Sequence, residues 1–193
     1  LERYGAVGFS IGNKGYMGTG TDDATFKKDF WEYDPAFNTW TQKADFGGTA
    51  RAFAVGFSIG SKGYLGVGYT PLVYYKDFWE FDPATNVWTQ KLDFGGTARY
   101  SAVGFNIGSK GYLGTGYVNE GTKKDFWEYD PASNTWTQKA DFGGTARKDA
   151  VGFSIGSTGY LGTGGATDGI KKDLWAYDPA TNAWTQKADF AGE

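Results

Sequence analysis

The sequence predicts an all-β fold built from four copies of one four-stranded antiparallel unit. Two observations carry this prediction: the chain repeats itself every 48 residues, and its short apolar runs alternate with the two-residue period of a strand. No segment shows a helical period. The repeat is marked by all eight tryptophans, which fall into two series with a spacing of 48: Trp31, Trp79, Trp127, Trp175 and Trp40, Trp88, Trp136, Trp184.

The second repeat shows why each element is expected. Residues 54–59 alternate small with large apolar side chains, as in a strand that packs on both faces. A turn at 60–63 leads to a second strand at 64–68, so that the two strands form a hairpin. A longer connection, 69–76, then precedes a third strand at 77–81.

The second half of the repeat follows from its turn residues. Residues 82–86 begin with Asp82 and Pro83 and end with Asn86, which predicts a tight turn because proline fixes φ and the Asp and Asn side chains bond the local backbone. The turn delivers a fourth strand at 88–91, and a Gly-rich stretch at 95–98 leads to the next repeat. We expect residues 1–193 to form one domain with units at about 3–50, 51–98, 99–146 and 147–193.

These repeated residues resemble a known family. Arg51, the Gly-rich end of the second strand, Asp82-Pro83, Asn86 and Trp88 together resemble the kelch repeat, whose period is about 50 residues, and the likeness recurs in all four units. The resemblance implies a kelch-type β-propeller with four blades of four antiparallel strands per chain. One departure is Gly66-Val67-Gly68, where the family usually has a Gly-Gly pair. The chain looks most like near-identical kelch arrays of bacterial secreted or cell-surface proteins, which implies an extracellular or cell-surface location.

Four blades are fewer than the family commonly has, so closure of the ring is a question in its own right. A closed ring of four units would splay neighbouring blades by about 90°, whereas a ring of eight would need only about 45°. We expect a homodimer in which two chains join head to tail as one eight-bladed ring; a closed four-bladed monomer is the alternative.

Composition excludes several classes of function. The chain has no Cys and no His, which removes disulfides, Cys/His zinc sites and His-dependent nucleophilic catalysis. The formal net charge of −3 argues against nucleic-acid binding, and no apolar run reaches the length of a membrane span. We expect no cofactor, no metal site and no catalytic residue.

The four copies differ from one another mainly in two places, just before the first strand and in the connection between the second and third strands. In an antiparallel unit both connections emerge on the same side of the disc, here called the variable side, where they set ligand specificity or drift freely as loops. These segments are rich in aromatic residues, which solvated loops rarely need. The candidate ligand-binding residues there are Tyr4, Phe53, Tyr100, Phe26, Tyr69, Tyr74, Tyr75 and Tyr117.

A second candidate site is the set of arginines, which keep the 48-residue spacing: Arg3, Arg51, Arg99 and Arg147. Converging guanidinium groups would suit a carboxylate, sulfate or acidic peptide, and in peptide-binding kelch domains an Arg at the matching position can contribute to such a pocket. The alternative is that each Arg bonds carbonyls or carboxylates between blades. No acidic residue is expected to be spaced with the arginines, which argues against a sialidase-like site.

The sequence therefore predicts a non-catalytic recognition or scaffold module that binds a protein or a glycan through the variable side. Two alternatives stay open: a structural or engineered near-consensus repeat protein without a ligand, and a carbohydrate-active enzyme. The repeated carboxylates do not favour the enzyme, because Asp77 and Asp82 would stand about 16 Å apart along an extended strand. Asp82 is better explained as a cap of its turn.

Overall fold

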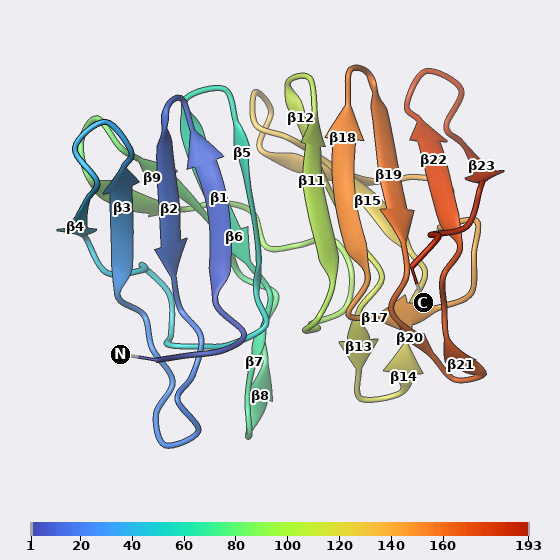
Figure 1. The fold of residues 1–193 in the computed structure, drawn as a ribbon, viewed down its shortest axis with the longest axis horizontal. Coiled ribbons are helices and arrows are strands. Elements are labelled where there is room, and N and C mark those ends of the chain that lie inside the picture. Colours follow the sequence, from blue (N-terminus) through green and yellow to red (C-terminus); the bar gives the residue numbers. More distant parts are fainter. Residues whose placement is uncertain (1, 193) are drawn as a thin grey trace.

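The computed structural model describes residues 2–192, which form four four-stranded antiparallel sheets, one for each repeat. In every sheet the strands pair in chain order, from an innermost to an outermost strand. The innermost strands β1, β5, β11 and β18 stand side by side across the middle of the molecule (Figure 1). The chain is therefore an all-β protein of propeller-like architecture, and residues 2–192 contain no helix that could cross a membrane.

The sheets have the following strands. The first sheet contains β1 (Val7–Ile11), β2 (Lys14–Gly18), β3 (Phe30–Asp34) and β4 (Thr39–Lys43). The second contains β5 (Val55–Ile59), β6 (Lys62–Gly66), β9 (Phe78–Asp82) and β10 (Val87–Gln90). The third contains β11 (Val103–Ile107), β12 (Lys110–Gly114), β15 (Phe126–Asp130) and β16 (Thr135–Gln138). The fourth contains β18 (Val151–Ile155), β19 (Thr158–Gly162), β22 (Leu174–Asp178) and β23 (Ala183–Lys187).

Short strands that the sequence did not predict lie in the connections. They form two-stranded hairpins in the second and third repeats and a three-stranded sheet in the fourth, and they project from the lower edge of the molecule in Figure 1. Their bounds are β7 (Tyr69–Thr70), β8 (Val73–Tyr74), β13 (Tyr117–Val118), β14 (Gly121–Thr122), β17 (Arg147–Lys148), β20 (Gly165–Ala166) and β21 (Gly169–Ile170).

The first hairpin of each repeat is tighter than predicted. In the second repeat the expected turn at 60–63 was too long, because Lys62 already pairs with Ile59 and only residues 60 and 61 remain in the turn. Gly60 stands at φ +58°, a left-handed conformation that glycine adopts without strain. The second strand accordingly ends earlier, at Gly66, and Val67 turns the chain at φ +52°.

The core lies between successive sheets rather than within them. In the second repeat Val55, Phe57 and Ile59 are buried against the third sheet, and Gly56 on the opposite face leaves no room for a Cβ beside Val7 of the first sheet. Phe30 meets Phe81 and Trp88 of the next repeat edge to face, at 5.0 Å between ring centroids in each case. Small residues on one sheet face thus receive large residues from the preceding sheet, which explains the alternation in the sequence.

The ring is not closed within the chain. Val151, Phe153 and Ile155 of β18 are 58%, 42% and 63% exposed, because no sheet covers that face. Their equivalents in the second repeat are at most 7% exposed. A closed four-bladed monomer is therefore contradicted.

Candidate functional site

The predicted aromatic residues come together on the variable side. Two kinds of segment meet there, because the backbone just before each first strand bridges to the connection that follows the second strand, as between Ala52 and Tyr69 and between Tyr100 and Tyr117. Seven of the eight candidates form one group of touching rings, here called the aromatic cluster: Tyr4, Phe26, Phe53, Tyr69, Tyr74, Tyr100 and Tyr117.

The centre of the cluster is Tyr100. Its ring lies 4.7 Å from Tyr69, 5.1 Å from Tyr74 and 5.5 Å from Tyr117, measured between centroids. Burial, followed by the nearby phenols of Tyr74 and Tyr117, raises the pKa of Tyr100 to about 12. The Tyr100 phenol is therefore neutral at physiological pH. The cluster as a whole spans residues of three repeats.

The cluster is partly accessible and carries charge at its two ends. Tyr4 is 47% exposed and donates a hydrogen bond of 2.5 Å to Asp23. At the opposite end the Lys148 ammonium lies 5.5 Å from the centroid of Tyr117, in cation–π geometry. The other five rings are half-buried, so ordered aromatic surface remains available on this side.

One member of the cluster has an unfavourable backbone. Phe53 stands at φ +52°, where a bulky side chain is strained, and the equivalent positions Gly5, Ser101 and Asp149 are also left-handed. Its amide donates a hydrogen bond of 2.8 Å to the carbonyl of Gly5 in the preceding repeat. A strained residue held by its surroundings is a feature of functional sites. Sequence reasoning did not find this strain, since no turn motif marks it.

Tyr75, the eighth aromatic candidate, lies apart from the cluster. Its ring stacks on the guanidinium of Arg51 at 4.0 Å. The other repeats have Lys27, Lys123 and Lys171 at this position. Tyr75 therefore covers an arginine and does not extend the cluster.

The arginines do not converge on a free surface. Arg51, Arg99 and Arg147 are completely buried, and each forms a two-point ion pair with an aspartate of its own repeat. In the second repeat the two bonds from Arg51 to Asp77 measure 2.5 and 2.8 Å. This arrangement fits the alternative in which the arginine serves the repeat.

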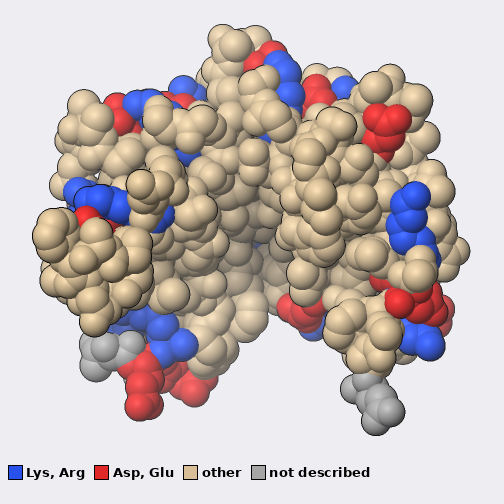
Figure 2. All heavy atoms as spheres, turned by 45° about the horizontal axis from the view of Figure 1, so that its top comes forward, with Lys and Arg blue, Asp and Glu red and all other residues tan. Residues whose placement is uncertain are grey.

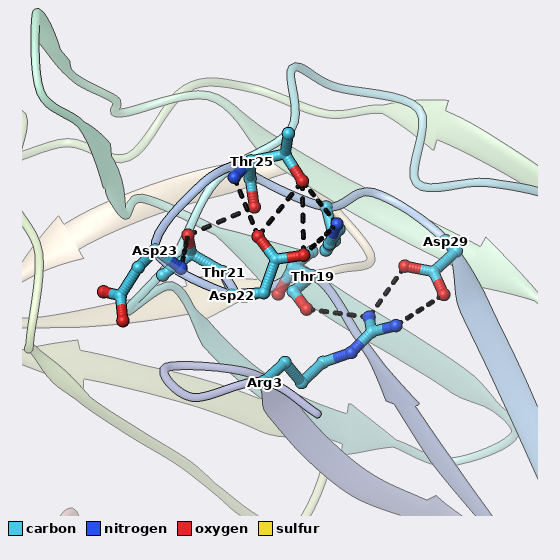
Figure 3. Close-up of polar contacts among 8 residues, drawn as sticks. Arg3, Thr19, Thr21, Asp22, Asp23, Thr25 and Asp29 are labelled. Atoms are coloured by element: carbon cyan, nitrogen blue, oxygen red, sulfur yellow. Dashed lines mark hydrogen bonds and ion pairs between the residues drawn. The ribbon is translucent and has the colours of Figure 1, made fainter. Parts of the chain in front are cut away.

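The aspartate partners correct one expectation from the sequence. An acidic residue does accompany every arginine at a constant separation of 26 positions, which is a signal that the repeat pattern already contained. In the first repeat Arg3 binds Asp29 and the carbonyl of Thr19, as Figure 3 shows. The hydrogen bonds from Arg3 lower the pKa of Asp29 to about 2. Each of these aspartates also accepts a bond from a neighbouring indole, such as Trp31.

The loop carboxylate Asp22 of the first repeat is bound by residues of its own loop. Asp22 pairs with Lys27 at 2.6 Å and accepts a bond from the Thr25 amide, which together lower the pKa of Asp22 (Figure 3). Asp82 and its equivalents accept a bond from an amide of their turn, as the sequence predicted. Within residues 2–192 no three acidic side chains gather in a group that could hold a metal ion.

The inner strands also line a small central cavity of about 210 Å³. Its wall consists mainly of Ala, Gly and Val from all four repeats, with Ala6, Ala54, Ala102 and Ala150 at equivalent positions. The molecule is hollowed in the middle, and most of the surface facing the viewer in Figure 2 is free of Lys, Arg, Asp and Glu. The cavity offers no charged side chain for recognition.

Comparison with known proteins gives information about the fold. No family model matches the sequence, and no curated protein matches it. Among solved structures, the chain is similar to one titled "Structure of YjhT", with a TM-score of 0.83 and 18% sequence identity, over 100% of this chain and 67% of that chain. At this identity the likeness establishes that the two share an all-β repeated-sheet architecture.

Proposed function

We propose that this protein is a non-catalytic recognition module that binds a protein partner through the aromatic cluster. The observation that carries the proposal is the position of the cluster: seven touching rings lie where the four repeats differ most in sequence. The repeated fold does not require aromatic residues here. The fourth repeat has Lys148 at the position of Tyr4 and Tyr100, and Asp149 at the position of Phe53. Tyrosine is enriched at the energetic centres of protein interfaces.

The order within the cluster supports binding. Rings that already pack on one another lose little conformational freedom when a partner arrives, and tyrosine supplies a large contact area with few rotatable bonds. Leu72, which is 94% exposed, and Val73, which is 46% exposed, extend the apolar surface beside Tyr74. We therefore expect a partner segment with apolar side chains and backbone groups that accept or donate bonds to the phenols.

Binding is favoured over catalysis because the candidate carboxylates already have structural partners. Asp77 is held by Arg51 and Trp79, and Asp82 caps its turn. A ligand-free structural array would not need exposed apolar and aromatic side chains such as Tyr4 and Leu72 on this side.

The kelch resemblance is part of the same proposal. The residues that carry it have repeated tasks: Arg51 binds Asp77, Asn86 accepts a bond from the Ala44 amide, and Trp88 donates one to the Ala44 carbonyl. These contacts recur through the chain and account for the motif physically. The secreted or cell-surface location expected from the resemblance belongs to the proposal as well.

The proposal is tested by selecting binders from a displayed peptide library and by screening a glycan array in parallel. The double variant Tyr69→Ala/Tyr74→Ala should weaken peptide binding about tenfold or more. The matched control is Phe37→Ala, an aromatic residue that is 78% exposed in a turn on the opposite side. Near-ultraviolet circular dichroism and the melting temperature show whether each variant remains folded.

Three outcomes would contradict the proposal. Binding that is insensitive to the Tyr changes but lost in Phe37→Ala, Ser61→Ala or Thr85→Ala would place the site on the opposite side. Hits on the glycan array alone would replace the protein partner with a carbohydrate. A folded, stable chain without hits on either library would favour the structural alternative.

A further inference from the structure

The two terminal sheets each leave one face uncovered, and the two faces are different. At the end formed by the fourth repeat, Val151, Phe153, Ile155 and Phe190 are between 42% and 63% exposed. At the end formed by the first repeat, Met17 is 46% and Trp40 is 51% exposed. We call these the Phe190 end and the Trp40 end.

The junctions inside the chain show what covers such faces. At each junction the ring of a phenylalanine meets two tryptophans of the next repeat; Phe46 lies 6.0 Å from Trp79 and 5.1 Å from Trp88. The same geometry recurs at Phe94 and Phe142. Phe190 is the equivalent phenylalanine at the uncovered end, and Trp31 and Trp40 are the equivalent tryptophans at the other end.

A groove at the Phe190 end has the position of a receptor for these indoles. It has a volume of about 660 Å³ and is lined mainly by apolar residues, among them Val151, Phe153, Leu174 and Phe190, and also by Asp173 and Asp189. Ala176 stands where the other repeats have Glu32, Glu80 and Glu128, so this face lacks the carboxylate that the internal faces carry. A cavity at the Trp40 end is lined by Arg3, Met17, Trp31 and Trp40.

The two ends also carry the hydrogen-bonding groups that pair with each other at the internal junctions. Inside the chain, the indole of Trp88 donates to the Ala44 carbonyl at 3.1 Å, and the amide of Ala44 donates to Asn86 at 2.9 Å. Both bonds recur at the other two junctions. At the ends, Asn38 and Trp40 have this role on one side, and the Ala188 backbone has it on the other.

Arg3 shows the same incompleteness. The internal Arg51 lies 5.0 Å from the ring of Phe46 in the preceding repeat and is fully buried. Within residues 2–192 no phenylalanine ring covers Arg3 in this way, and its side chain is 15% exposed. Phe190, the ring that would cover an arginine in the next repeat, is 63% exposed.

We propose that a second copy of this chain docks head to tail, with its Trp40 end on the Phe190 end of the first copy. The contact continues an interface that the chain already forms three times, with the equivalent phenylalanine and tryptophans in the same register. It is heterologous, since each copy uses two different surfaces, and two copies using both surfaces complete a ring of eight sheets. The inference goes beyond the proposed recognition function and does not depend on it.

Cysteine cross-linking tests the register directly, because the chain has no cysteine of its own. Val7 touches the position of a Cβ at Gly56 across the first junction, and the same contact recurs between Val55 and Gly104 and between Val103 and Gly152. Across the proposed interface the corresponding pair is Val151 of one copy and Gly8 of the other. We expect Gly8→Cys/Val151→Cys to form a covalent dimer under mild oxidation, on a non-reducing gel.

Two further cysteine pairs serve as controls. Val7→Cys/Gly56→Cys should cross-link within one chain, which shows that the geometry permits a disulfide. Gly8→Cys/Ile170→Cys should give no dimer, because Ile170 lies in β21, outside the four-stranded sheet that forms the end face. A cross-link within the single chain for Gly8→Cys/Val151→Cys, or equal dimer yield with Ile170→Cys, would overturn the proposal.

Light scattering after size-exclusion chromatography provides a second readout without cysteines. The unmodified chain should have twice the mass of one chain. Ile155→Lys should have the mass of one chain, whereas the matched variant Ile170→Lys should stay dimeric, since Ile155 is 63% exposed on the end face and Ile170 is 88% exposed in the short strand β21. An unmodified chain of single mass, or a ladder of higher multiples, would overturn the two-copy ring.

Discussion

Arg51 holds the carbonyl of Val67 at 3.0 Å while Val67 stands in the left-handed region at φ +52°. A β-branched residue is strained there, and the same bond recurs from Arg99 to Thr115 and from Arg147 to Thr163, all at positive φ. The buried Arg51 guanidinium thus stabilises the turn at Val67, which lies 16 positions further along the chain. This relationship gives the repeated arginine a structural role.

Arg51→Lys should lower the free energy of unfolding by about 3 kcal/mol, because an ammonium cannot replace two parallel bonds to Asp77 and the Val67 carbonyl together. Chemical denaturation measures the loss. A comparable loss in Arg3→Lys, where the site is less buried, would contradict this explanation.

Thr115→Val should leave stability unchanged or raise it by about 1 kcal/mol. The Thr115 hydroxyl is buried without a hydrogen-bond partner, and the second repeat already has a valine, Val67, at this position. The reverse change Val67→Thr should be destabilising by about 1–3 kcal/mol, since it buries an unpaired hydroxyl. A lower melting temperature for Thr115→Val together with a higher one for Val67→Thr would disprove the assignment.

Trp88→Ala should cost about 3–5 kcal/mol, because the indole packs on Phe30, Phe46 and Phe81 and bonds the Ala44 carbonyl. Tyr74→Ala should cost far less, since this half-buried ring lies in the short hairpin strand β8, outside the core between the sheets. Trp40→Ala is the matched tryptophan control, to be measured at a dilution where the chain is monomeric. Equal effects of Trp88→Ala and Tyr74→Ala on the unfolding midpoint would mean that core and loop are misassigned.

Stability should fall as the pH drops from about 4 to about 2. The pKa of Asp29 is lowered to about 2 by its bonds from Arg3, so its ionised form stabilises the fold above the unfolded value of 3.8 and this contribution disappears as the pH falls through the folded value. The free energy of unfolding, measured by chemical denaturation across this range, should depend less steeply on pH in Asp29→Asn than in the unmodified chain. An unchanged slope would show that Asp29 does not contribute.

At alkaline pH, stability should fall as the pH rises. The pKa of Tyr100 is raised to about 12 from 10.0, so its stabilising contribution is complete below pH 10 and is lost as the pH rises through the folded value. Absorbance titration of phenolate should show one less late-titrating tyrosine in Tyr100→Phe. Identical titration curves for the two proteins would contradict the buried position of Tyr100 in the cluster.

Much of the architecture could be predicted from the sequence because it is written as a local pattern four times over. The alternation at Val55–Ile59, the Asp82-Pro83 turn and the spacing of the tryptophans follow from short-range geometry: strand period, fixed φ of proline and side-chain bonds to the nearby backbone. The same comparison of copies identified the variable side and the aromatic residues on it.

Only the tertiary structure decided which of these residues meet. Tyr69 and Tyr100 are 31 positions apart and belong to different repeats, yet their rings are neighbours because successive sheets stack and align their loops. Arg51 precedes β5 and Asp77 precedes β9. The two become partners because both strands pair with β6 in one sheet, and not through adjacency in sequence. Local patterns determine a strand or a turn, whereas contacts between repeats depend on how the twisted sheets pack, which determines whether an arginine is exposed to a ligand or buried under a phenylalanine.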